Sequence, residues 1–75
     1  MVDLFGERIK HQRDKLSLSL IDFSREIGVD PISQEKHEEG VLVPDIYYLY
    51  KLHRLGVDIQ YVITGVPSKI DLTGV

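Results

Sequence analysis

Apolar residues recur at helical spacing along most of the chain, and turn-forming residues separate the apolar segments. The first such segment predicts an amphipathic helix over Leu4–Lys15, in which Phe5, Ile9 and Leu16 point inward and charged residues occupy the other side. No alternating run bounded by turns occurs in the first 65 residues, so strands are not expected there.

A second helix is predicted from the residues that start and stop it. Ser19 followed by Asp22 resembles a capping box, which supplies hydrogen-bond acceptors to the first N–H groups of a helix. The helix that follows directs Phe23 and Ile27 inward and ends at Gly28.

A third helix is predicted to begin at the pair Asp30-Pro31, with aspartate as the cap and proline at the first helical position. It runs to about Glu38 and ends at Gly40. Residues 41–44 then form an extended connection, because a residue that precedes proline avoids the helical region.

Two more helices follow, each preceded by aspartate. Asp45 caps a fourth helix that ends at Gly56, and its predicted inward residues are Ile46, Leu49 and Leu52, with His53 as a further candidate. Asp58 caps a short fifth helix, Ile59–Thr64, closed by Gly65. Residues 66–75 are predicted to be a disordered or dimer-associated tail, with an edge strand over Lys69 to Leu72 as the alternative.

Length and composition limit the protein to a single small domain. The chain has 75 residues, of which 43% are hydrophobic, no cysteine and a net charge of −3. Disulfides and thiolate metal sites are therefore excluded, and stability must come from an apolar core or from self-association. Charged residues interrupt the N-terminal segment before a signal sequence can form, and no apolar run approaches the length of a membrane span, so we expect a cytoplasmic protein.

The second helix, the short turn after Gly28 and the third helix have the lengths and spacing of a helix-turn-helix. The alternative is an ordinary bundle in which two short helices meet at a glycine turn for packing alone. The sequence strings that bear on this choice are Leu18-Ser19, Phe23-Ser24, Gly28-Val29 and His37-Glu38-Glu39-Gly40, then Pro44-Asp45, Tyr48-Leu49, Gly56-Val57-Asp58, Tyr61-Val62 and Thr64-Gly65.

In this order and spacing, these strings resemble the phage repressor and Cro family of helix-turn-helix proteins, also called the XRE type, and in particular small prophage-encoded regulators. The resemblance covers Phe5 to about Gly65. It implies an all-α, compact five-helix bundle over residues 1–65, and a homodimeric regulator of transcription that inserts its recognition helix, about 31–38, into the major groove of operator DNA. It also implies an internal ion pair between Arg13 and Glu38, for which the alternative is two solvated surface charges.

Within this resemblance, five residues are the expected DNA contacts. On the recognition helix, Gln34 and Lys36 would read bases if they point outward, and Ser33 would touch phosphate. Ser19 and Arg25 would lie near phosphates, together with basic residues of the first helix.

The expected DNA-binding face departs from the family pattern. The family commonly has glutamine after the capping serine, where this chain has Leu20 followed by Ile21, and the recognition helix begins with Pro31 and Ile32. Ile32 could contact a thymine methyl group, but such a contact discriminates weakly. Residues 29–45 hold one lysine against five acids, a net charge of −4, whereas phosphate neutralisation normally supplies much of the affinity for DNA.

The same residues suggest an alternative function. Leu20, Ile21, Pro31 and Ile32 would form an exposed apolar patch, which is typical of protein interfaces. The chain would then be a repressor-like protein that binds another protein, such as a regulator whose DNA-binding surface it blocks, and not DNA. The alternative is that some of these side chains turn into the core.

The remaining chemical candidates are weaker. Tyr47, Tyr48 and Tyr50 cannot all be buried on one helix, and an exposed one is consistent with a homodimer contact through the fourth and fifth helices. The three histidines lack metal-pair spacing, and no catalytic triad, phosphate loop or carboxylate pair is evident. We therefore predict no enzyme activity, cofactor or metal site.

Overall fold

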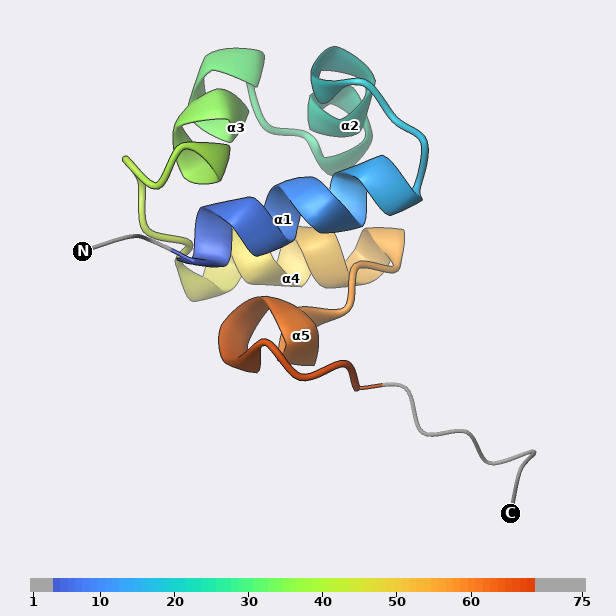
Figure 1. Cartoon of the computed structure of the whole chain (residues 1–75). Coiled ribbons are helices and arrows are strands. Elements are labelled where there is room, and N and C mark those ends of the chain that lie inside the picture. Colours follow the sequence, from blue (N-terminus) through green and yellow to red (C-terminus); the bar gives the residue numbers. More distant parts are fainter. Residues whose placement is uncertain (1–3, 69–75) are drawn as a thin grey trace.

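A computed structural model describes residues 4–68, which form five helices and no strand (Figure 1). The helices are α1 (Leu4–Lys15), α2 (Leu20–Ile27), α3 (Pro31–Glu38), α4 (Ile46–Leu55) and α5 (Ile59–Thr64). These bounds confirm the predicted all-α bundle, whereas most of the predicted tail lies outside the described residues. Within residues 4–68, no helix is long and apolar enough to cross a membrane.

The helix ends form where the capping residues predict them. Four helices begin at a side chain that accepts a backbone N–H three residues later, namely Ser19, Asp30, Asp45 and Asp58. Three of these helices end at a glycine in the left-handed region: Gly28, Gly56 and Gly65. Local signals at both ends thus fix the helix boundaries before tertiary packing is considered.

The helices pack around one small core. In Figure 1, α2 and α3 lie on one side of α1, and α5 lies on the other. α1 packs against α3 and α5, α2 packs against α3 and α4, and α4 also contacts α5. The buried apolar residues come from every helix except α3 and from the loop between α4 and α5: Ile9, Phe23, Ile27, Tyr48, Leu52, Val57 and Val62. α3 therefore meets the bundle through polar side chains.

The inward face of α4 differs from the prediction. Ile46, predicted to point inward, is 85% exposed, and His53 is also exposed. Leu52 is fully buried as predicted, and Tyr48 is buried beside it at 5% exposure. Ile9 on α1 is fully buried as predicted, whereas Phe5 and Leu16, also predicted to point inward, are exposed at 37% and 39%. Hydrophobic spacing therefore located these helices but did not fix their rotation.

α1 holds the two ends of the bundle through different contacts. At its start, Gly6 lies so close to the end of α3 that an added Cβ atom would be 2.5 Å from the carbonyl oxygens of His37 and Glu38. Two residues later, Arg8 Nη1 donates to the carbonyl of Val62 at 3.2 Å and to that of Ile63 at 3.3 Å, near the end of α5. α1 thus contacts the α3 backbone directly and caps α5 with a cation.

Candidate nucleic-acid interface

α2, the turn after it and α3 form the predicted helix-turn-helix. The turn is tight because Gly28 adopts φ 73° and ψ 36°, a left-handed conformation that glycine adopts without strain. Asp30 then caps α3 by accepting from the Ser33 N–H at 2.9 Å, and Pro31 occupies the first turn of the helix. This geometry exposes one side of α3 and packs the other against the bundle.

The inner side of α3 carries a continuous polar network. Gln34 is fully buried, and its amide donates from Nε2 to Glu38 Oε2 at 2.8 Å. Its amide oxygen accepts from the Tyr48 hydroxyl at 2.7 Å, which links α3 to α4. Within residues 4–68, every buried side-chain nitrogen and oxygen has a hydrogen-bond partner. A satisfied network of this kind rigidifies the helices that it joins.

Glu38 extends this network to α1 through the predicted ion pair. Arg13 donates from Nε to Oε2 at 2.8 Å and from Nη2 to Oε1 at 2.9 Å, and both side chains are close to 10% exposed or less. The hydrogen bond to Glu38 raises the pKa of the Arg13 guanidinium above its ordinary value. Arg13 also donates to the Leu18 carbonyl at 3.0 Å. The prediction of an internal pair, and not two surface charges, is therefore confirmed.

His37 completes the inner side of α3. Its ring stacks on that of Tyr48, with centroids 3.8 Å apart and planes 12° apart, and its Nδ1 lies 3.2 Å from the Leu42 carbonyl oxygen. Burial lowers the pKa of His37, against an opposing effect of the Leu42 contact. Burial also raises the pKa of the Tyr48 hydroxyl. Both side chains are therefore neutral in the folded protein at neutral pH.

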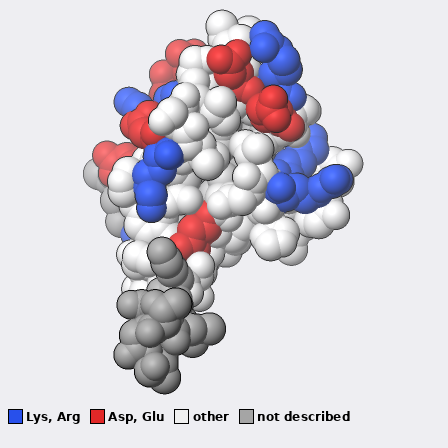
Figure 2. Space-filling model, turned by 90° about the vertical axis from the view of Figure 1, so that its right-hand side faces the viewer, with Lys and Arg blue, Asp and Glu red and all other residues white. Residues whose placement is uncertain are grey.

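The outer side of α3 offers few groups to a nucleic acid. Its exposed residues are Pro31, Ile32, Glu35 and Lys36, and Glu39 is exposed at the helix end. Lys36 is the basic residue among them. On the face drawn in Figure 2, which includes α2, basic and acidic side chains of the described residues are interspersed. Because Glu38 is paired internally with Arg13, Glu35 and Glu39 stand against Lys36 at the exposed surface of α3, which carries only part of the local excess of acid predicted from the sequence.

The five predicted DNA contacts lie in different environments. Lys36 is exposed as required, and Arg25 is exposed and lies 3.2 Å from Asp22. Ser19 is exposed, with its Oγ accepting from the Asp22 N–H. Ser33 is half-buried and donates from Oγ to Asp30 at 2.8 Å.

Gln34 does not meet the condition on which its assignment depended. The prediction required an outward-pointing amide, but the side chain is fully buried and both ends of its amide are bonded to Tyr48 and Glu38. Its physical role in the structure is to join α3 to its neighbours, and it is not available to a base.

The predicted apolar patch is largely exposed. Ile21 is 56% and Ile32 66% exposed, Pro31 is exposed, and Leu20 is half-buried. Three of the four side chains are therefore exposed, as the patch requires. Leu20 alone of the four is partly turned toward the core.

Sequence reasoning missed two residues that hold α3 in place. Tyr48 bonds and stacks against α3, and Gly6 allows the close approach of α1. A signal for Tyr48 was present, because Tyr48, Leu52 and Leu55 follow the spacing of one helix face. No local pattern marks Gly6, since its role depends on a helix some 30 residues away in the chain. Within residues 4–68, no group of three potential metal ligands occurs.

Comparisons with known proteins agree with this geometry. The structure is similar to the solution structure of the DNA-binding domain of the P22 C2 repressor, with a TM-score of 0.77, 25% sequence identity and coverage of 95% of each chain. No protein-family model and no curated protein sequence matches the chain. The similarity extends over nearly the whole domain, including the helix-turn-helix and the helices around it. The chain has the fold of a helix-turn-helix domain of the phage repressor type.

Proposed function

We propose that this protein is a sequence-specific DNA-binding regulator of transcription, with α3 as its recognition helix. The main support is the helix-turn-helix within a fold that matches, over 95% of its length, a domain that binds DNA. In this arrangement α3 enters the major groove while α2 crosses the phosphate backbone.

The proposed contacts follow from exposure on α2 and α3. Lys36 donates to base edges or phosphate, and Ile32 packs against a thymine methyl group. Ser19, Arg25 and Ser33 lie near phosphates, where they position the protein without reading sequence.

We further propose that the protein acts as a homodimer through α4 and α5. Exposed apolar side chains on both helices support this, with Ile46 at 85% and Ile63 at 49% exposure. Two copies would then read two half-sites related by a two-fold axis.

The experiment is a selection from random duplex DNA, followed by fluorescence-anisotropy titration of the selected duplex at low and moderate salt. We expect sequence preference and an affinity that falls steeply with salt. Lys36→Ala should weaken binding by about tenfold, because a lost base or phosphate contact costs roughly 1–3 kcal/mol. The matched control is Arg54→Ala, which removes an exposed cation of α4 outside the proposed DNA contacts. Absence of binding at low salt by a folded dimer would contradict the proposal.

A second candidate function rests on the exposure of Ile21, Pro31 and Ile32. In this alternative, the patch binds another protein, such as a DNA-binding regulator, and the acidic surface of α3 keeps the domain off DNA. Ile32→Asp should then abolish partner binding, whereas Val43→Asp, at an exposed position outside the patch, should not. Specific DNA binding in the titration above would argue against this candidate.

A further inference from the structure

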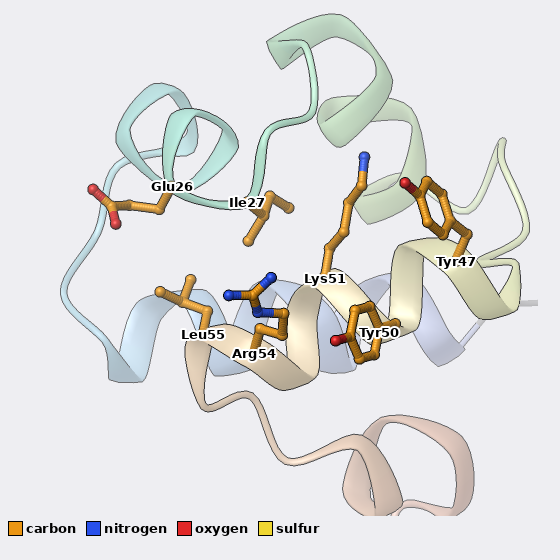
Figure 3. Close-up of a pocket in the computed structure, with 7 residues that line it drawn as sticks. All are labelled: Glu26, Ile27, Tyr47, Tyr50, Lys51, Arg54 and Leu55. Atoms are coloured by element: carbon orange, nitrogen blue, oxygen red, sulfur yellow. The ribbon is translucent and has the colours of Figure 1, made fainter.

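A groove lies on the side of α4, beneath the turn that joins α2 to α3 (Figure 3). Its volume is about 470 Å³, within the roughly 300–1,000 Å³ typical of ligand pockets. The apolar part of its lining comes from Ile27 at the end of α2 and Leu55 at the end of α4. The rest of α4 contributes Tyr47, Tyr50, Lys51 and Arg54. None of these residues belongs to the exposed side of α3.

Two cations in this groove have no acidic partner in the described part of the chain. The ion pairs formed within residues 4–68 involve neither Lys51 nor Arg54. Lys51 Nζ lies 3.4 Å from the Gly28 carbonyl oxygen and 4.9 Å from the centroid of the Tyr47 ring, so neutral groups hold it in place. Glu26 also lines the groove, but Figure 3 shows its carboxylate pointing away from both cations.

The aromatic residues make this surface different from a solvated basic patch. Tyr47 and Tyr50 are 69% and 56% exposed, so most of each ring is unburied in the monomer. Tyrosine and arginine are the residue types that contribute most to protein interfaces, where a flat ring covers apolar surface and a guanidinium binds a carboxylate in two places.

We propose that this groove binds an acidic peptide segment of a partner protein. Carboxylates of the segment pair with Lys51 and Arg54, while an adjacent apolar side chain lies against Ile27 and Leu55. Charge complementarity supports this ligand, because the surface offers two unpaired cations on a chain whose net charge is −3. An apolar lining and two phenol rings suit a peptide better than a phosphate backbone, which needs cations alone.

The test is fluorescence-anisotropy titration of the full chain with a fluorescein-labelled peptide that carries two glutamates beside a tryptophan. The matched peptide has glutamines in place of the glutamates. We expect the acidic peptide to bind more tightly than its neutral match, with an affinity that decreases as salt is added. Arg54→Ala and Lys51→Ala should each weaken binding by about tenfold, as is common for central interface residues.

The control variant is Lys10→Ala, which removes an exposed cation of α1 outside the groove. Arg54 is exposed and forms no ion pair with another of residues 4–68, so its variant should fold normally, and a thermal melt verifies this. Equal loss of peptide binding in Lys10→Ala and Arg54→Ala would overturn the proposal, because it would indicate a general charge effect.

Three further outcomes would also overturn the proposal. The first is equal binding of the two peptides, and the second is competition for the groove by duplex DNA or inorganic phosphate at concentrations similar to that of the peptide. The third is loss of self-association in Arg54→Ala, which would assign the groove to a second copy of the chain. The proposal does not depend on DNA binding. Lys36→Ala should leave peptide affinity unchanged, so failure of one proposal is distinguishable from failure of the other.

Discussion

The two sides of α3 differ in how many contacts they make with the rest of the domain. On the inner side, Gln34 and His37 are buried and Glu38 is partly buried, and each has a defined partner on another helix or in the following loop. On the outer side, Ile32 and Lys36 are exposed, and no hydrogen bond of their side chains to another described residue is formed. The difference indicates that contacts of the inner side determine the position of α3, and that the exposed side chains of Ile32 and Lys36 contribute little to it.

Glu38→Ala should have the largest effect on stability of the variants that test this difference between the two sides, and Glu39→Ala is its matched control. Removal of Glu38 leaves the largely buried Arg13 with only the exposed carboxylate of Asp14, 3.8 Å away, and leaves Gln34 with an unpaired amide donor, which should cost about 3 kcal/mol or more. For a domain of this size the melting temperature should fall by more than about 10 °C. Glu39 is exposed, and its loss should change stability by less than about 0.5 kcal/mol. Both melting temperatures are measured by circular dichroism. Equal, small decreases in the two variants would show that the inner network does not determine the position of α3.

Tyr48→Phe should have the next largest effect. The variant keeps the ring and its stacking on His37 but leaves the buried Gln34 amide oxygen without a donor, at a cost of about 1–2 kcal/mol. Tyr47→Phe is the matched control, because the Tyr47 side chain is exposed. Urea titrations of both variants measure the difference, and an unchanged midpoint in Tyr48→Phe would show that water replaces the lost hydroxyl.

The protonation of His37 should make the stability of the inner side pH-dependent. Burial lowers the pKa of His37 below its ordinary value of 6.5, so the unfolded chain binds a proton at higher pH than the folded chain. This contribution to stability is present above about pH 6.5 and is lost as the pH falls, with a slope of at most about 1.4 kcal/mol per pH unit. His37→Phe should flatten the dependence measured by urea unfolding between pH 7.5 and pH 5.5, whereas His53→Phe, at an exposed position, should not.

The smallest effect concerns the outer side alone. Glu35→Gln combined with Glu39→Gln removes two exposed acids from the proposed DNA-binding face, and should raise affinity for duplex DNA by roughly two- to fivefold at low salt without changing stability. Anisotropy titration and a melt of the same sample measure both quantities. A loss of stability in this double variant would show that the two sides of α3 are not independent.

The sequence predicted the helices well because their boundaries depend on local chemistry. Ser19, Asp30, Asp45 and Asp58 cap helices through hydrogen bonds that span three residues, and such signals can be recognised without knowledge of the fold. The pair of Arg13 and Glu38 was anticipated only through a family resemblance, since 25 positions separate the two residues.

Side-chain orientation was harder to predict. Gln34 is buried although its residue type is usually exposed, because Tyr48 and Glu38 satisfy both ends of its amide. Ile46 is exposed although its residue type is usually buried, because contacts with α3 turn Tyr48 inward. The groove of α4 was also missed, although Tyr47, Tyr50, Lys51 and Arg54 follow the spacing of one helix face.

The close approach at Gly6 affects how mutational data on this domain should be interpreted. A systematic survey of substitutions would find position 6 as sensitive as the buried positions of the core, since any side chain there meets backbone oxygens that cannot move aside. Such sensitivity, taken alone, resembles that of a ligand-binding residue. Because Gly6 lies at the contact between α1 and the end of α3, its variants should lose fold and binding together, whereas variants of a true contact residue lose binding alone.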